Sequence, residues 1–439
     1  MASTRACRAA GKHHAQRPSL TALRQEGEGR RARRLLDPGV TLLLSMPTPA
    51  PTLLVLNGGS TSLRFALSRA DAMLTRVCGG TIERIGHDDA HLRLDDGTRE
   101  AVVARDPGQA VHALVHWLRE GGRAEAVVAV GHRVVHGMGH FDPERVTPGL
   151  LAELRRIEPV DPDHLPVEIA LIEAALVALP RVVHVACFDT RFHRDLPRVA
   201  AQLPLPRRLE AQGLRRYGFH GLSYAFLREA LGRLAGDGAA RGRVILAHLG
   251  GGSSLAALRD GRCIDTTMSF TPTAGLVMGT RSGDLDPSLG PYLERTAGLS
   301  GAEFLKMVNH ESGMLGVSGT SADMRELLAA EPDDARAAEA VALFCYQARK
   351  AIGGFAAALG GLDTLVFSGG IGENSPVVRA RICEGLQFLG VHVDADRNAG
   401  APGTISPPTG RVAVHVIRTD EAHIIARDVR DLLALEGSP

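Results

Sequence analysis

The stretch "VILAHLGGGSSLAAL", residues 244–258, decides the fold. An apolar run enters a glycine turn with two serines and then resumes, which is typical of two strands joined as a β-hairpin. Residues 53–67, "LLVLNGGSTSLRFAL", repeat this arrangement, and the two segments match in residue type at most positions when aligned on their glycines. A hairpin repeated near the start of each half predicts a duplicated fold with two related domains.

Buried strands and helices alternate between and after the two hairpins. Residues 126–135 and 182–189 read as buried strands, whereas 163–179 and 334–359 have the periodicity of helices. The chain is therefore predicted to be of the α/β class.

A third glycine turn follows a strand at "LVFSGGIGENS", residues 365–375, with a helix expected from Pro376. Backbone N–H groups in glycine turns can close on an anion. Facing turns from two domains could thus hold the phosphates of a nucleotide from both sides.

Composition excludes several classes of function. A net charge of +1 and 4% aromatic residues argue against nucleic-acid binding. The three lysines, Lys12, Lys306 and Lys350, lie outside any G-K-[ST] motif, so phosphate chemistry must depend on arginine, histidine, metal and backbone. The six cysteines form no C-x-x-C pair, and no apolar stretch is long enough to span a membrane. We expect a soluble, cytoplasmic protein without a membrane or nucleic-acid partner.

The first 45 residues differ from the rest, with nine Arg or Lys against three Asp or Glu. We expect residues 1–45 to be a disordered N-terminal extension, or to precede a true start at Met46. An arginine-rich transit peptide is the alternative, which the acidic residues and the scarcity of serine disfavour.

Charged side chains gather where the predicted strands end, which is where α/β sheets bind ligands. Each has a structural explanation by itself, such as a surface ion pair, a turn or a helix cap. Together they are the set that phosphoryl transfer needs, because arginines neutralise the transferring group and carboxylates hold Mg²⁺. The segments are "VGHRVVHG" with His132, Arg133 and His136, "CFDTRFH" with Asp189 and His193, "RRYGFHG" with Arg215, Arg216 and His220, "GLVMGTRSGDLDP" with Arg281, Asp284 and Asp286, and "IRTDEAHIIARD" with Asp420 and Glu421.

From about Leu53 onward this series of motifs resembles that of the acetate kinase family. The motifs that carry the resemblance are "LLVLNGGSTSLRFAL", "GHRVVHG", "FDTRFH", "RRYGFHG", "HLGGGSS", "DTTMSFTPTAGLVMGTRSGDLDP", "SGMLGVSGTSADMREL", "SGGIGENS" and "RTDEAHIIARD". The resemblance implies two duplicated RNase H-like domains of the actin, Hsp70 and sugar-kinase type, with a cleft between them. Domain I would span 52–189 plus 422–439, and domain II would span 190–421.

The resemblance also implies the reaction. The chain would transfer phosphate from ATP to a short-chain carboxylate, acetate first, giving an acyl phosphate and ADP reversibly and by direct in-line transfer. Mg²⁺ or Mn²⁺ would assist, and the protein would be a homodimer. Two alternatives stay open: a propionate or butyrate kinase, and an ATP-binding regulatory protein with weak kinase activity.

Matching positions imply a role for each site residue. Catalysis would fall to Asp189, Arg133, His220 and Arg281. The acceptor would be bound by Arg133, Val135, Val160, Phe219 and Pro272. ATP would be bound by Asn57, Ser60, Ser62, Arg64, His248, Gly250, Gly251, Gly252, Asp323, Met324, Arg325, Gly370, Ile371, Gly372 and Asn374. The metal would be held at Asn57 and Glu421.

The chain departs from the family's motifs at several positions. Gly251 replaces an asparagine, Ala274 a glutamate, and Leu222 and Tyr224 a threonine and a histidine. Arg64 stands where the family usually has lysine.

Asp161, in "PVDPD", replaces a histidine near the substrate. A carboxylate there opposes a carboxylate substrate, so we expect Asp161 either to pair with a nearby base such as Arg133 or to turn away. If it stays ionised in the pocket, the KM for acetate should be high.

Overall fold

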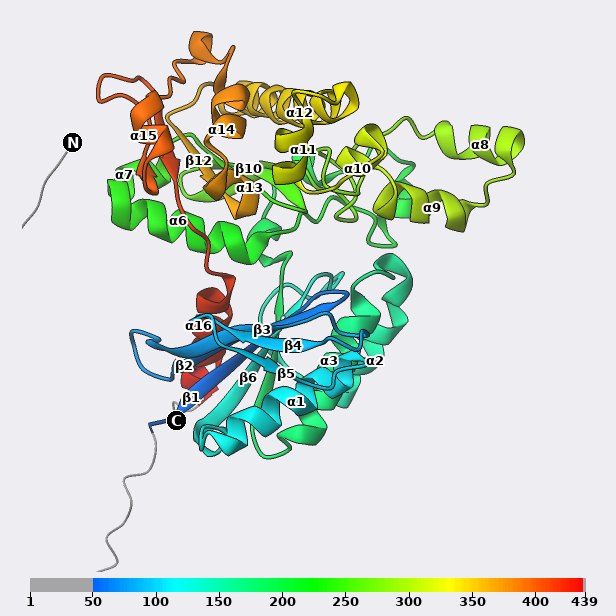
Figure 1. Ribbon diagram of the computed structural model, residues 1–439, viewed down its shortest axis with the longest axis vertical. Helices are drawn as coiled ribbons and strands as arrows, with labels where there is room; N and C mark the ends of the chain where they lie inside the picture. Colours follow the sequence, from blue (N-terminus) through cyan, green and yellow to red (C-terminus); the bar gives the residue numbers. More distant parts are fainter. Residues whose placement is uncertain (1–49, 437–439) are drawn as a thin grey trace, which may run out of the picture. The chain divides into compact units, whose positions relative to one another are not determined.

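The computed structural model describes residues 50–436, which form two β-sheets covered by helices (Figure 1). The first sheet has the order β5-β4-β3-β2-β1-β6-β8-β7 and the second the order β11-β10-β9-β12-β14-β13. The strands of the first sheet are β1 (Thr52–Gly58), β2 (Ser62–Arg69), β3 (Arg76–Glu83), β4 (His91–Leu94), β5 (Arg99–Ala101), β6 (Val127–Val134), β7 (Glu144–Arg145) and β8 (Val183–Phe188). Those of the second are β9 (Val244–Leu249), β10 (Ser253–Arg259), β11 (Arg262–Thr266), β12 (Thr364–Ser368), β13 (Gly403–Thr404) and β14 (Ala413–Val416).

The α-helices connect these strands and follow the last of them. They are α1 (Pro107–Glu120), α2 (Pro148–Arg156), α3 (Leu165–Ala178), α4 (Arg198–Ala201), α5 (Arg207–Glu210), α6 (Gly221–Ala235), α7 (Asp237–Arg241), α8 (Leu289–Ala297), α9 (Gly301–His310), α10 (Gly313–Ser318), α11 (Met324–Ala330), α12 (Ala335–Leu359), α13 (Gly369–Asn374), α14 (Pro376–Cys383), α15 (Ala395–Ala399) and α16 (Glu421–Glu436). Within residues 50–436, none of them is both long and apolar enough to cross a membrane.

The two sheets repeat one topology, as the paired hairpins predict. β1 pairs antiparallel with β2 and parallel with β6, and β9 pairs antiparallel with β10 and parallel with β12. In each sheet a further strand lies beside the hairpin, β3 in the first and β11 in the second. On the other side a second parallel strand follows, β8 in the first and β14 in the second. The order β3-β2-β1-β6-β8 therefore corresponds to β11-β10-β9-β12-β14. The α/β class and the duplication are confirmed.

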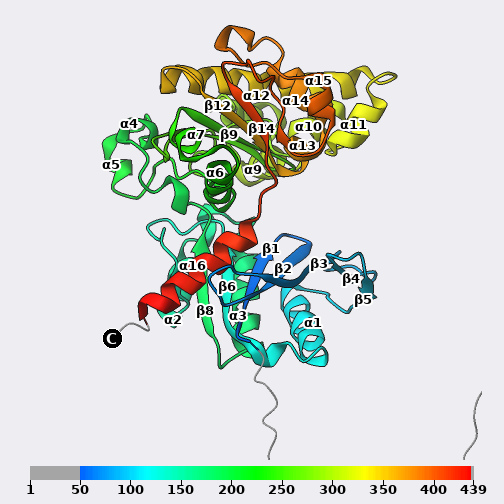
Figure 2. The ribbon, with the colours of Figure 1, turned by 90° about the vertical axis from the view of Figure 1, so that its left-hand side faces the viewer.

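Each sheet is the middle of three layers. Helices α1 and α3 cover one face of the first sheet and α16 covers the other, as Figure 2 shows for the strands β1, β6 and β8. In the second sheet, α12 and α14 pack on one face and α6 on the other. Helix α6 contacts both sheets: Leu227 packs against the second sheet, whereas Leu222 packs with Ile425 of α16 against the first.

Two sequence expectations about boundaries need comment. The chain enters α13 directly at Gly369, so the expected plain turn before Pro376 is wrong, although α14 does begin at Pro376. Gly369 has φ of +76° and its backbone lies against that of Leu249, a combination open to glycine alone. The domain bounds given above stay predictions, and the expected extension 1–45 and the residues after 436 lie outside the described residues.

A close contact between β6 and α16 gives the first prediction. A Cβ at Gly131 would lie 2.5 Å from Cγ2 of Ile425 and 2.8 Å from Cγ2 of Val429. Gly131→Ala should therefore destabilise the protein by about 1–3 kcal/mol through overpacking and lower its Tm by a few degrees. Gly354→Ala in α12 is the control, because a Cβ there meets open space and should leave Tm unchanged or slightly raised. Equal melting temperatures for both variants would contradict the close packing of α16.

Candidate active site

The two repeated hairpins face one cavity of about 790 Å³, a size suited to a nucleotide-sized ligand. The first hairpin contributes Asn57 and Arg64 to its wall, and the β9–β10 turn contributes Gly250–Gly252. The start of α13 and the residues that lead into α16 complete the wall. The glycine turn of the second hairpin therefore borders a cavity that can hold a ligand of this size.

Part of the residue set expected to bind ATP lies on this cavity. Lining it are Asn57, Arg64, His248, Gly250, Gly251, Gly252 and Gly370, together with His220 and Glu421. The remaining residues do not line the cavity. Ser60 lies in the first hairpin turn and Ser62 follows it, while Ile371, Gly372 and Asn374 belong to α13. Asp323 and Arg325 form an ion pair at the start of α11, and Met324 is buried in the core. Their roles stay predictions.

Sequence reasoning missed Glu373, which organises the turn after β12. Its Oε1 accepts hydrogen bonds from the backbone N–H of Gly369 at 2.9 Å and of Thr419 at 3.2 Å, and Glu373 lines the cavity. The carboxylate stands inside the quoted motif "GGIGEN", so its place after a strand end was the available signal. Also missed among the lining residues were Arg76, Phe226, Arg418 and Thr419.

Asp189, directly after β8, connects β6 to the start of α6. Its buried carboxylate accepts hydrogen bonds from Nη2 of Arg133 at 2.8 Å and from the backbone N–H of His220 at 3.1 Å. Asp189 also accepts from the N–H of Leu222 at 3.4 Å, in the first turn of the helix. Three of the expected catalytic residues, Asp189, Arg133 and His220, therefore belong to one bonded group.

Arg133 lies among three carboxylates. Its Nη1 lies 3.8 Å from Oε1 of Glu168, which is buried on α3, and its Nε has no hydrogen-bond partner among the described residues. Burial alone would lower the pKa of Arg133, but the charges of Asp189, Glu421 and Glu168 raise the pKa above its ordinary value. A permanently charged guanidinium that keeps part of its side chain exposed is suited to bind an anion.

His220 is held as a neutral imidazole. Burial and the nearby rings and guanidinium groups of His248, Arg133 and Arg281 lower its pKa well below the ordinary value. Its Nδ1 lies 2.8 Å from Oγ of Ser254, and its ring stacks on His248 with centroids 4.3 Å apart. Its backbone has φ of +57°, a left-handed conformation at the residue before α6.

Arg281 and His220 both approach Gly252 of the glycine turn. A Cβ built at Gly252 would be 3.4 Å from Nε2 of His220 and 3.5 Å from Nη1 of Arg281, so both side chains reach the backbone of the turn. Burial lowers the pKa of Arg281, and the charges of Asp161 and Asp163 oppose this shift. All four expected catalytic residues thus converge beside the second hairpin.

The residues expected to line the acyl pocket are only partly gathered. Val135 and Phe219 pack in one buried cluster with Met268 and Met278. Val160 packs instead with the cluster beneath α2 and α3. Pro272 is buried, and its carbonyl oxygen accepts from Nη1 of Arg281 at 3.4 Å.

Several charged residues at strand ends have structural partners. His132 and His184 form a buried pair at 3.0 Å, His193 bonds the carbonyl of Phe219, and Arg216 donates to the carbonyl oxygens of residues 266–268. Asp420 caps α16, because its Oδ1 accepts from the N–H of His423 at 3.0 Å.

The structure gives a different partner to Asp161 than the arginine we named. Asp161 is buried and its Oδ1 lies 2.8 Å from Nδ1 of His164, so the expectation of a base holds but Arg133 as that base is wrong. Arg133 is already paired with Asp189, which leaves Asp161 to the histidine three residues along the chain. Neither His164 nor Glu168 was named from the sequence, because both lie in a segment that reads as an ordinary helix start.

The other departures have different surroundings. Leu222 packs in the core, and the Tyr224 hydroxyl bonds Ser254, the residue that contacts His220. Gly251 has open space where a Cβ would lie. Nothing in the structure explains Ala274.

Glu168 gives a prediction about stability and pH. Burial raises the pKa of Glu168 from 4.5 to about 7, against the opposing charge of Arg133. The folded chain therefore binds the proton of Glu168 more tightly than the unfolded chain does. This proton binding stabilises the folded state fully below pH 4.5, and the stabilisation is lost as the pH rises through about 7. Glutamine does not titrate, so Glu168→Gln should not lose stability in this way. The free energy of unfolding of the variant minus that of the wild type should therefore rise by up to about 3 kcal/mol between pH 4.5 and 7. Urea unfolding of both proteins at a series of pH values measures the difference, and a difference that is constant with pH would contradict the raised pKa.

A sequence profile described as the acetokinase family matches residues 52–427. The chain is 45% identical over 391 residues to the acetate kinase of Rhodopseudomonas palustris (strain TIE-1), which covers 86% of this chain and 97% of that protein. Among solved structures, the acetate kinase of Porphyromonas gingivalis matches with a TM-score of 0.78 and 34% identity over 88% of this chain and all of that one. A propionate kinase from Francisella tularensis subsp. tularensis SCHU S4 matches with a TM-score of 0.81 and 33% identity, covering 86% of this chain and 98% of that one. The chain belongs to the acetokinase family.

Proposed function

We propose that this protein transfers the γ-phosphoryl group of ATP to a short-chain carboxylate, with acetate as the first candidate, and so forms an acyl phosphate and ADP. One observation carries the proposal. Two half-buried arginines, Arg133 and Arg281, lie with His220 beside a glycine turn that borders a cavity of nucleotide size. Phosphoryl transfer requires positive charge and hydrogen-bond donors around the transferring group, and these side chains supply both.

The reaction proceeds in one displacement. A carboxylate oxygen of the acceptor forms a bond to the γ-phosphorus while the bond from that phosphorus to the bridging oxygen of ADP breaks. Arg133 binds the acceptor carboxylate and Arg281 meets the oxygens of the transferring group. Asp189 orients both Arg133 and the start of α6, so the donors are fixed before substrate arrives.

His220 acts as a neutral donor. When the Tyr224 hydroxyl donates to Ser254 and Ser254 donates to Nδ1 of His220, the ring proton lies on Nε2. Nε2 is the nitrogen nearest the backbone of Gly252, where a phosphoryl oxygen would lie. Tyr224 thereby sets the tautomer that the reaction uses.

A divalent metal, Mg²⁺ or Mn²⁺, fits the side-chain oxygens of Asn57 and Glu421 at the start of α16. Nδ2 of Asn57 donates to Oε2 of Glu421 at 3.0 Å, and burial raises the pKa of Glu421 although Arg133 opposes the shift. No group of three or more His, Cys, Asp or Glu within residues 50–436 could hold a metal by itself. This suits Mg²⁺, which takes one or two protein oxygens together with substrate phosphates. Bound there, the metal would neutralise phosphate charge.

Further parts of the proposal depend on the family. The propionate kinase among the solved relatives keeps propionate, and by extension butyrate, open as the preferred acceptor. We also propose a homodimer in the cytoplasm. A regulatory protein with weak kinase activity is the second candidate function, favoured by the replaced residues Asp161 and Gly251.

Trapping of the acyl phosphate with hydroxylamine tests the proposal. The purified protein with ATP and Mg²⁺ should give hydroxamate from acetate or propionate, and chelation of the metal should abolish it. Binding of ATP without hydroxamate from any acid of two to four carbons would favour the regulatory alternative and end the kinase proposal.

The same assay checks the arginines. Arg133→Ala and Arg281→Ala should each lower kcat by about 10²–10⁴-fold, because each removes charge stabilisation from the transition state. Lysine should restore activity only partly, since it lacks the planar fork of the guanidinium. Near-normal turnover in either alanine variant would remove that residue from the site.

A further inference from the structure

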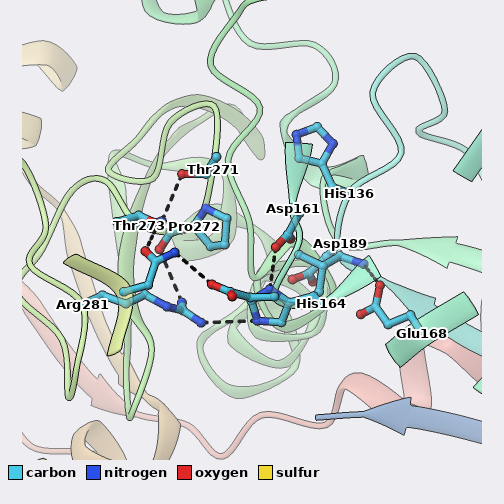
Figure 3. A network of polar contacts seen from close by, with 12 residues as sticks. His136, Asp161, His164, Glu168, Asp189, Thr271, Pro272, Thr273 and Arg281 are labelled. Atoms are coloured by element: carbon cyan, nitrogen blue, oxygen red, sulfur yellow. Dashed lines mark hydrogen bonds and ion pairs between the residues drawn. The ribbon is translucent and has the colours of Figure 1, made fainter. Parts of the chain in front are cut away.

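Asp161, His164 and Arg281 form a continuous chain of polar contacts. Oδ1 of Asp161 lies 2.8 Å from Nδ1 of His164, and Nε2 of His164 lies 3.3 Å from Nη2 of Arg281. Figure 3 shows the ring of His164 between the carboxylate and the guanidinium, with one nitrogen toward each. The three residues come from separate parts of the chain, since His164 directly precedes α3 and Arg281 lies in the loop before α8.

The chemistry of the partners fixes the proton on His164. A guanidinium has only N–H donors, so Nε2 of His164 must accept the hydrogen bond from Arg281. Nδ1 then carries the proton and donates it to Asp161. A ring protonated on both nitrogens would set N–H against N–H at Arg281. Asp161 thus orients a neutral imidazole, as a carboxylate orients the histidine of a catalytic triad.

Arg281 depends on this contact more than Arg133 depends on any single partner. Among residues 50–436, the side-chain hydrogen-bond partners of Arg281 are all uncharged acceptors: Nε2 of His164, the Pro272 carbonyl oxygen at 3.4 Å and the Met278 sulfur at 3.9 Å. Arg133, in contrast, is bonded directly to the carboxylate of Asp189. A carboxylate bonded to Arg281 would compete with phosphate oxygens for its charge, whereas a neutral nitrogen holds the side chain without neutralising it.

The segment that carries His164 is anchored separately. Oδ2 of Asp163 accepts from Nδ2 of Asn309 at 2.8 Å, and Oδ1 of Asp163 lies 3.1 Å from Nε2 of His310. Thr273 Oγ1 donates to Oδ1 of Asn309 at 2.6 Å, which ties the end of α9 to the loop before Arg281. The backbone around His164 is thus held by contacts that do not involve Arg281.

We propose that His164 is a positioning residue for Arg281, and that Asp161 acts through it by fixing its tautomer. The proposal rests on the proposed role of Arg281 in phosphoryl transfer. It gives a purpose to the carboxylate at position 161: Asp161 serves the guanidinium that meets the transferring group, without touching that group.

The test measures kcat and KM in single variants. His164→Ala should lower kcat by roughly tenfold to 100-fold, as expected for a misplaced reacting group, with a smaller change in the KM for acetate. His164→Gln should restore most of the loss, because its amide oxygen can accept from Arg281. Asp161→Asn keeps an acceptor for Nδ1–H and should be milder than Asp161→Ala. If His164→Ala does not fold, His164→Leu takes its place, since it fills the volume without an acceptor.

A double-mutant cycle separates positioning from general stability. In the Arg281→Ala background, His164→Ala should lower kcat no further, because the residue it positions is gone. His310→Ala is the matched control: it removes a contact to the same segment but not to Arg281, so its effect should be equal in both backgrounds. Thermal melting and ATP binding check that each variant is folded.

The outcomes distinguish the positioning role of His164 from the proposed role of Arg281 in phosphoryl transfer. An equal loss from His164→Ala in both backgrounds, or a glutamine variant no better than alanine, would overturn the positioning role and leave the proposed function intact. Near-normal kcat in Arg281→Ala would overturn the role of Arg281 in the proposed function and the inference together.

Discussion

The bonded group around Asp189 is the constraint on which the site depends. This carboxylate is fully buried, and burying a charge is costly unless it is paired and hydrogen-bonded. Asp189 meets the cost with the guanidinium of Arg133 at 2.8 Å and the N–H of His220 at 3.1 Å. The same bonds fix where β6 ends, where β8 ends and where α6 begins. One ion pair therefore sets the positions of two reactive side chains from segments more than 80 residues apart in the sequence.

Sequence patterns predicted the fold well because the fold depends on local signals. Alternating apolar strands and glycine turns at 58–61 and 250–252 specify hairpins by themselves, and their repetition specifies the duplication. The long helix α12 begins and ends within one residue of its expected bounds. The error at Gly369 arose because a helix that starts at a left-handed glycine carries no local capping signal.

The site was predictable only where a motif carried it. Strand ends and glycine turns indicated Asp189, His220, Arg281 and Gly250–Gly252. Of these, His220 and Gly250–Gly252 line one cavity, Asp189 accepts a hydrogen bond from the N–H of His220, and Arg281 approaches Gly252. His164 and Glu168 carried no such signal, because their contacts join residues more than 30 positions apart. Asp161 pairs with His164, only three residues along the chain, yet pairing with an arginine was the more obvious electrostatic choice. Side-chain geometry across a cleft is a property of tertiary structure, and periodicity does not report it.

The placement of α16 has a consequence for how the chain is made. One face of the first sheet, with Leu53, Val55 and Ala129, is covered by Ile425 and Val429 from the end of the chain. On a ribosome that adds about 5–20 residues per second, the strands of that sheet wait roughly 10–50 s after β8 is synthesised before this helix emerges. Throughout that interval an apolar sheet face stays open to water and to other nascent chains. The lobe that is translated first is therefore completed last, and its exposure during translation is a period in which a chaperone would have a surface to hold.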